Sequence, residues 1–135
     1  MEITRQLNPV RTLLAQLIRP RSDTHYEQFA TNWLRLHGLR LLQRNFRSKS
    51  GEVDIIMRDR DTTVFVEVKY RTSENTALDA VNYRKQQRIM RAAQQYCLKH
   101  PVLQNRPMRF DVITIEKHRG FIPSVSWYKG AFDAP

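Results

Sequence analysis

Four ionisable side chains interrupt the otherwise apolar halves of the stretch GEVDIIMRDRDTTVFVEVKYR, which spans residues 51–71. Glu52 and Asp54 alternate with apolar residues in its first half, and Glu67 and Lys69 alternate with apolar residues in its second. Alternation with a period of two is the pattern of a β-strand, so the stretch predicts a hairpin with charged positions where a core would be expected.

The register of this hairpin follows from its symmetry. With the turn centred on Arg60-Asp61, Asp54 faces Glu67 and Glu52 faces Lys69. The alternation then gathers five charged residues on one face of the sheet: Glu52, Asp54, Glu67, Lys69 and Arg71. The apolar residues of both strands are expected on the opposite face, which carries Val53, Ile55, Val66 and Val68.

Two opposed carboxylates suggest a metal site. The Cβ atoms of directly opposed residues lie about 4.5–5.5 Å apart, so Asp54 and Glu67 would repel each other unless a cation lay between them. Oxygen ligands favour Mg²⁺ or Mn²⁺, and Mg²⁺ takes one or two carboxylates together with water and phosphate oxygens. Lys69 would neutralise phosphate charge or help to activate a water, and Glu27 offers a third acid. The alternative is a hairpin with ordinary charge pairs on a solvent-facing side.

The charge of the chain favours a polyanionic partner. Lysine and arginine number 23 against 13 acidic residues, which gives a net charge of +10. Neither the segment 34–50 nor the segment 80–110 contains an acidic residue. Such single-sign blocks are typical of nucleic-acid-binding surfaces, although a basic soluble surface remains the alternative. The residues expected to bind nucleic acid are Arg47, Lys49, Arg84, Lys85, Arg88, Arg91 and Arg109.

Composition and length predict one folded domain in a reducing compartment. A chain of 135 residues can bury a core without disulfides, and its single cysteine, Cys97, points to the cytoplasm. We expect no membrane association, because no apolar run approaches the roughly 20 residues of a spanning helix. Residues 1–21 are interpreted as an arm with a short amphipathic helix, and residues 22–135 as the domain.

The elements that position the charged cluster can be predicted along the chain. A helix is expected from the capping residues 22–24 to Gly38, with an apolar stripe that includes Leu36, and a strand over residues 39–46. After the hairpin, a long helix is expected from about Leu78 to Lys99, followed by strands near residues 110–115 and 121–128. The order of elements is therefore one helix, three strands, another helix and two strands. This order predicts an α/β domain with a mixed sheet covered by helices.

The same residues carry a resemblance to a known family. Asp54, twelve further residues and then Glu67-Val68-Lys69 resemble the PD-(D/E)xK signature of restriction-endonuclease-like nucleases. The chain is identified as similar to the YraN family of small bacterial proteins through five segments: EQFATNWLRLHGLRLLQRNFRSKSGEVDIIM, VFVEVKYR, AVNYRKQQRIMRAAQQYCL, RFDVITI and GAF. The resemblance implies an αβββαβ core like that of archaeal Holliday-junction resolvases.

The resemblance also implies roles for individual residues. Glu27 matches the helix glutamate of the superfamily, Asp54 and Glu67 match its metal-binding acids, and Lys69 matches its catalytic lysine. Glu52 matches the glutamate of the Gly-Glu-(Ile/Val)-Asp motif of the YraN family. The family usually has a glycine just before the helix glutamate, whereas this chain has Asp23-Thr24-His25-Tyr26.

The leading hypothesis is therefore a Mg²⁺- or Mn²⁺-dependent DNA endonuclease, with branched or single-stranded DNA as the substrates to consider first. Asp54, Glu67 and the Val68 carbonyl would hold the metal, and Glu52 and Arg71 would support the site. The second hypothesis is a nucleic-acid-binding module that keeps the fold without cutting. A third is an assembly protein whose basic faces meet acidic partners. The oligomeric state stays open between a monomer and a homodimer.

Overall fold

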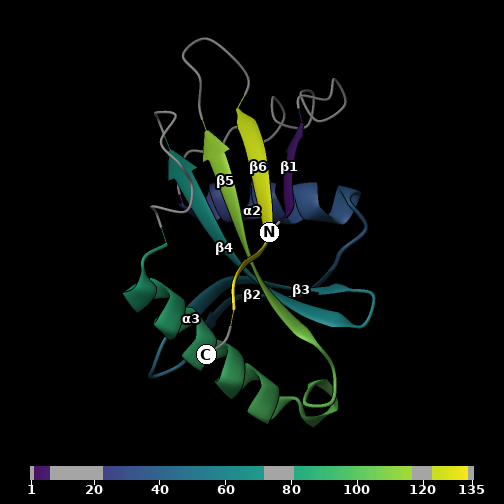
Figure 1. Ribbon diagram of the computed structural model, residues 1–135, viewed down its shortest axis with the longest axis vertical. Coiled ribbons are helices and arrows are strands. Elements are labelled where there is room, and N and C mark those ends of the chain that lie inside the picture. Colours follow the sequence, from purple (N-terminus) through teal and green to yellow (C-terminus); the bar gives the residue numbers. More distant parts are fainter. Residues whose placement is uncertain (1, 7–22, 72–80, 117–122, 134–135) are drawn as a thin grey trace.

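A mixed six-stranded sheet forms the centre of the protein (Figure 1). The computed structural model describes residues 2–6, 23–71, 81–116 and 123–133. The strand order among them is β1-β6-β5-β4-β3-β2, and only the β4–β5 pair is parallel. The strands are β1 (Glu2–Gln6), β2 (Arg40–Arg47), β3 (Glu52–Asp59), β4 (Thr62–Arg71), β5 (Met108–Glu116) and β6 (Ser124–Phe132). The helices are α2 (Asp23–Leu36), α3 (Tyr83–Lys99) and the short 3₁₀ helix η2 (Pro101–Leu103). The predicted α/β class with a mixed sheet is confirmed.

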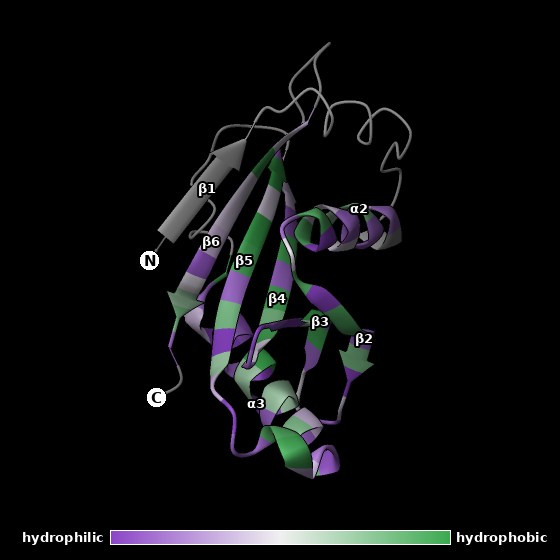
Figure 2. Ribbon diagram, turned by 90° about the vertical axis from the view of Figure 1, so that its right-hand side faces the viewer, coloured by the Kyte–Doolittle hydropathy of each residue, from purple (hydrophilic) through white to green (hydrophobic). Residues whose placement is uncertain are grey.

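The two long helices cover opposite faces of the sheet, as Figure 2 shows. Phe29 and Trp33 of α2 pack in one cluster with Ile55 and Met57 of β3. Ile89 and Tyr96 of α3 belong to a second cluster, which contains Val53, Ile56 and Phe65 from the sheet. The prediction of one apolar face and one charged face is therefore wrong for most of the hairpin, because a helix on each side requires apolar residues on both faces.

The predicted hairpin register is confirmed over its paired length. The aligned pairs run from Ile55–Val66 to Asp59–Thr62, and the turn is Arg60-Asp61. Arg60 has a φ of 56°, the left-handed conformation that a two-residue hairpin turn requires.

The alternation of side chains breaks at Asp54. Val53 and Ile56 share the α3 cluster, whereas Ile55 lies in the α2 cluster, so Val53 and Ile55 do not share a face as predicted. Asp54 lies between the paired positions Val53 and Ile55, next to Asn45 of β2, which has a φ of 52°. The Asp54 side chain belongs to neither of the two packed clusters.

The predicted helices match the structure with shifted ends. Leu36, predicted in the apolar stripe of α2, is 52% exposed. Helix α3 begins at Tyr83 rather than near Leu78, because the side chain of Asn82 caps it by accepting a hydrogen bond from the Lys85 amide at 2.9 Å. Neither helix has the length and hydropathy of a membrane-spanning segment.

The N-terminal residues include a strand that the sequence analysis did not predict. Strand β1 pairs antiparallel with β6, so residues 2–6 belong to the same sheet as the rest of the domain. The predicted amphipathic helix, with its stripe from Val10 to Ile18, lies outside the described residues.

Candidate active site

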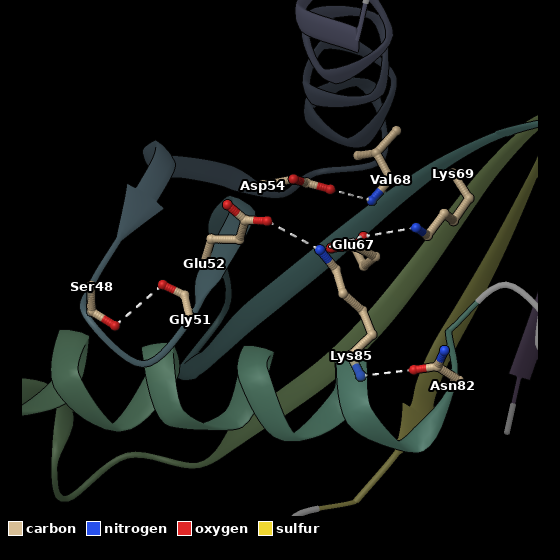
Figure 3. Close-up of polar contacts among 9 residues, drawn as sticks. All are labelled: Ser48, Gly51, Glu52, Asp54, Glu67, Val68, Lys69, Asn82 and Lys85. Atoms are coloured by element: carbon tan, nitrogen blue, oxygen red, sulfur yellow. Dashed lines mark hydrogen bonds and ion pairs between the residues drawn. The ribbon is translucent and has the colours of Figure 1, made fainter.

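Asp54 is anchored to the neighbouring strand by its side chain. Its Oδ2 atom accepts a hydrogen bond from the backbone amide of Val68 at 2.9 Å (Figure 3). The aligned β3–β4 pairs end at Ile55–Val66, so the carboxylate takes over as the acceptor for β4 where the backbone ladder stops. Asp54 is thereby held beside the Glu67-Val68-Lys69 segment, as the sequence predicts, although its hydrogen bond is with the Val68 backbone.

Glu67 is a buried carboxyl with incomplete hydrogen bonding. Only 3% of its side chain is exposed, and its Oε1 atom lies 3.4 Å from Nζ of Lys69 and 3.6 Å from Nζ of Lys85. Its Oε2 atom is buried without a hydrogen-bond donor among the described residues. Burial is the main cause that raises the pKa of Glu67 to about 8, and the negative charge of Asp54 adds to this effect. The positive charges of Lys85 and Lys69 act in the opposite direction and offset part of the increase. Besides the two ammonium groups, Glu67 has a second carboxyl group, that of Asp54, as a polar neighbour, and the two carboxyl groups can share either a proton or a cation.

Glu52 takes its partner from α3 rather than from the opposite strand. The sequence predicts Lys69 facing Glu52, but Nζ of Lys85 lies 3.3 Å from Glu52 Oε1. The hydrogen bond from Lys85 lowers the pKa of Glu52. Burial alone would lower the pKa of Lys85, but Glu67 and Glu52 outweigh it and raise that pKa.

A close approach of β3 to α3 brings Lys85 to the acids. A Cβ atom on Gly51 would lie 1.9 Å from the backbone oxygen of Arg88, so only glycine allows this contact. Gly51 itself is held by the Ser48 amide, which donates to its carbonyl at 2.9 Å. Lys85 stands about one helical turn before Arg88, on the part of α3 that this contact fixes.

Glu27 approaches the same acids from α2, on the other side of the sheet. Burial raises the pKa of Glu27 to about 7, and the charge of and hydrogen bonding with Asp54 add to this effect. The preceding residue, Tyr26, stacks on Tyr70 of β4 with ring centroids 4.0 Å apart. This stacked pair fixes α2 on β4 and so positions Glu27 beside Asp54.

These residues line one polar cleft of about 740 Å³. Its lining includes most of the predicted catalytic and supporting residues: Glu27, Arg47, Glu52, Asp54, Glu67, Val68, Lys69 and Lys85. Acids from α2, β3 and β4 therefore meet in one place with lysines from β4 and α3.

The donor set fits a hard divalent cation with few protein ligands. No ready-made group of three acid, histidine or cysteine ligands occurs in the described parts of the chain. Mg²⁺, however, usually takes only one or two carboxylates and completes its shell with water and substrate phosphate. Asp54 and the unsatisfied Oε2 atom of Glu67 match that requirement.

The remaining predicted residues lie in different surroundings. Lys49, Arg84, Arg88 and Arg91 are exposed. Arg109 does not line the cleft, because it is bound to Asp111 at 2.9 Å and to Asp59 at 3.1 Å. Arg71 ends strand β4, and its side chain lies outside the described structure.

The contact of Lys85 with the acids is not predicted from the sequence, in which Lys85 is expected among the phosphate-binding residues only. No local pattern reveals the contact, since Lys85 and Glu52 are 33 residues apart.

Comparison with known proteins identifies close sequence relatives. The profile of the family described as "Uncharacterised protein family UPF0102" matches residues 26–115. A UPF0102 protein of Pseudomonas syringae is 41% identical over 118 residues, which cover 86% of this chain and 96% of the relative. A UPF0102 protein of Nitrosococcus oceani is 42% identical over 78% of this chain and 86% of its own length. A UPF0102 protein of Legionella pneumophila is 40% identical over 80% and 91%, respectively.

Proposed function

The chain belongs to the UPF0102 family, which is also called the YraN family, and we propose that it is a metal-dependent DNA endonuclease of the PD-(D/E)xK superfamily. One observation carries the proposal. Asp54, fixed by the Val68 amide, stands beside the buried Glu67, and the Lys69 ammonium lies 3.4 Å from Glu67 in a polar cleft. This is the acid-acid-lysine arrangement that the sequence signature describes.

Asp54, Glu67 and the Val68 carbonyl would hold Mg²⁺ or Mn²⁺. When bound, such an ion lowers the pKa of a water molecule and stabilises negative charge on a phosphodiester. A neutral Glu67 must lose its proton to bind the ion, so metal affinity rises with pH through the elevated pKa of Glu67.

The other side chains of the cleft have distinct tasks. Lys69 is held by Glu67 and would neutralise phosphate charge at the metal. Glu27, with a pKa of about 7, can accept or release a proton near neutral pH, as a general acid or base must. Both residues line the cleft, so both can reach a substrate that enters it.

A basic surface beside the cleft would hold the DNA backbone. Arg47 lines the cleft, and Arg84, Arg88 and Arg91 are exposed on α3. Contacts of this kind bind phosphates and read no bases, so strong sequence specificity is not expected.

A cleavage assay tests the proposal. The purified protein is incubated with Mg²⁺ or Mn²⁺ and with duplex, single-stranded and four-way-junction DNA. We expect metal-dependent cleavage of at least one substrate, lost in Asp54→Ala and Lys69→Ala and retained in Lys99→Ala, which lies outside the cleft. If the folded protein binds DNA without metal and cleaves none of the substrates, the proposed endonuclease activity is refuted.

That refuting result would favour the second hypothesis, a non-catalytic binding module. DNA binding itself is tested by salt. Affinity for duplex DNA should fall by about 0.9 log unit per contacted phosphate for each tenfold rise in salt. A flat salt response would exclude the basic surface as a DNA-binding site and would favour an interaction with proteins.

A further inference from the structure

Lys85 connects the two acidic strands from outside the sheet. Its Nζ atom lies 3.3 Å from Oε1 of Glu52 on β3 and 3.6 Å from Oε1 of Glu67 on β4 (Figure 3). We propose that Lys85 is a positioning residue that competes with the divalent metal for Glu67 and couples metal binding to the binding of a DNA phosphate. The proposal rests on the proposed function of the same cleft.

The competition follows from the charges around Glu67. Two ammonium groups, those of Lys69 and Lys85, already lie within 3.6 Å of one carboxylate oxygen. A divalent cation on Glu67 would place two further positive charges beside them in a partly buried cleft, where repulsion is poorly screened. One ammonium must then withdraw for the metal to bind tightly.

Lys85 is better placed to withdraw than Lys69. Lys69 is two residues from Glu67 on β4 and forms an ion pair with it at 3.4 Å. Lys85 has a second acid, Glu52, and approaches from a different element. Its backbone is fixed by the Asn82 cap and by the Gly51–Arg88 contact, so the flexible stem of the side chain can swing while α3 stays in place.

A phosphate that enters the cleft offers Lys85 a new partner. The phosphate would draw the ammonium away from Glu67 and leave that carboxylate to the metal. Metal and phosphate would then each increase the affinity for the other by the same factor, because coupling between two ligands is reciprocal. The basic surface on α3 brings the phosphate to the same helix that carries Lys85.

Calorimetric titration of Mn²⁺ tests this coupling without measuring cleavage. The wild type, Lys85→Gln and Lys85→Arg are titrated alone and with a phosphorothioate-linked single-stranded oligonucleotide, which keeps its charge and resists hydrolysis. Lys99→Gln is the matched control, because it makes the same change on the same helix outside the cleft.

In the wild type, the oligonucleotide should tighten Mn²⁺ binding by about tenfold, within the usual range of coupling. Lys85→Gln should bind Mn²⁺ about tenfold more tightly without oligonucleotide and gain less than twofold from it. Lys85→Arg and Lys99→Gln should keep the wild-type coupling. A merely structural role for Lys85 would lower the melting temperature of Lys85→Gln and leave the coupling unchanged.

The failure of this inference can be distinguished from failure of the proposed function. If the wild type binds Mn²⁺ and cleaves DNA, but Lys85→Gln keeps wild-type Mn²⁺ affinity and coupling, the role of Lys85 is refuted and the nuclease stands. If the wild type binds no Mn²⁺ with or without oligonucleotide, both are refuted. If Mn²⁺ binds with the expected coupling and no DNA is cleaved, the role of Lys85 stands and the nuclease does not.

Discussion

Two buried carboxylates on neighbouring strands have opposite surroundings. Asp111 of β5 pairs with Val66, and the next residue of β4 is Glu67. Asp111 is fully buried and accepts four hydrogen bonds: from Nε and Nη2 of Arg109 at 2.9 and 3.1 Å, from Nε1 of Trp127 at 2.9 Å and from the Gly130 amide at 2.9 Å. Glu67 is almost as buried, but one of its oxygens has no donor.

The difference separates a structural acid, Asp111, from the acid to which we assign a function, Glu67. The donors around Asp111 satisfy both of its oxygens and tie β5 to β6 and, through Arg109, to Asp59 of β3. Glu67 has ammonium groups at longer range and another carboxyl nearby, which is unfavourable for folding alone. Unsatisfied buried acids are costly, so their presence in a cleft is a signature of a binding or catalytic site.

The substitution Glu67→Gln should have the largest effect, which is a loss of metal-dependent DNA cleavage. Glutamine keeps the shape of the side chain but removes the negative charge that would hold the metal. We expect the rate of metal-dependent cleavage to fall by at least about 100-fold, because a group that stabilises charge in the site is lost. Single-turnover cleavage in Mg²⁺ measures it.

Stability of the same variant completes the test. We expect the free energy of unfolding of Glu67→Gln to stay within about 1 kcal/mol of the wild type or to rise, since the glutamine oxygen can still accept from the lysines and Oε2 has no donor to lose in the described part of the chain. Cleavage at the wild-type rate would show that Glu67 does not take part in the reaction.

Asp111→Asn makes the matching change at the structural acid. The new amide group would point hydrogens at one of the two donor pairs. Arg109 would keep one hydrogen bond to the remaining oxygen, and Asp59 would be its remaining carboxylate partner. Breaking a buried charge pair in this way costs about 3–5 kcal/mol. Urea denaturation should show this loss, while cleavage per folded molecule stays at the wild-type level. A stable Asp111→Asn variant with no activity would reverse the roles of the two acids.

Sequence reasoning found the part of the site that is local in the chain. Asp54 and Glu67 lie on the two strands of one hairpin, so period-two alternation and the turn were enough to place them together. The break in alternation at Asp54 was not predictable, because no residue of the hairpin sequence signals it. Asn45, which lies opposite Asp54 on β2, has a φ of 52°.

Parts of the fold that depend on distant contacts were missed for the same reason. The contact of Lys85 with Glu52 arises only when α3 packs on β3 at Gly51. Arg109 was assigned to DNA binding because its basic segment contains no acid, yet Asp59 and Asp111 fall beside it in space. Strand β1, with the sequence EITRQ, shows too little alternation to be recognised without its partner β6.

The stability of the protein should depend on pH through the carboxyl groups of the cleft. The folded-state pKa values of Glu67, about 8, and Glu27, about 7, lie above the ordinary value of 4.5. Each group therefore binds more protons in the folded state, and its contribution is fully present below 4.5 and is lost as pH rises through the folded pKa.

The free energy of unfolding, measured in EDTA, should accordingly fall between about pH 5 and about pH 8, with a slope of at most about 1.4 kcal/mol per pH unit for each group. In Glu67→Gln, the free energy of unfolding should decrease less steeply with pH, because the contribution of Glu67 to the slope is removed. An equal slope in the variant and the wild type would show that Glu67 has the same pKa in the folded and unfolded protein.

Gly51→Ala should lower stability less than Asp111→Asn and should have a selective effect on the Glu67 site. The added Cβ would lie 1.9 Å from the Arg88 carbonyl oxygen, so β3 and α3 must separate, at a cost of about 1–3 kcal/mol. Because Lys85 and Glu52 sit on the elements that separate, their contact should weaken, whereas the Asp111 cluster on β5 and β6 is not involved.

Gly38→Ala is the control: its φ of 94° strains any other residue, but nothing lies within 4 Å of the added atom. Both variants should lose stability in urea, and only Gly51→Ala should change Mn²⁺ affinity. Equal Mn²⁺ affinity in the two variants would mean that the packing of α3 does not position the acids.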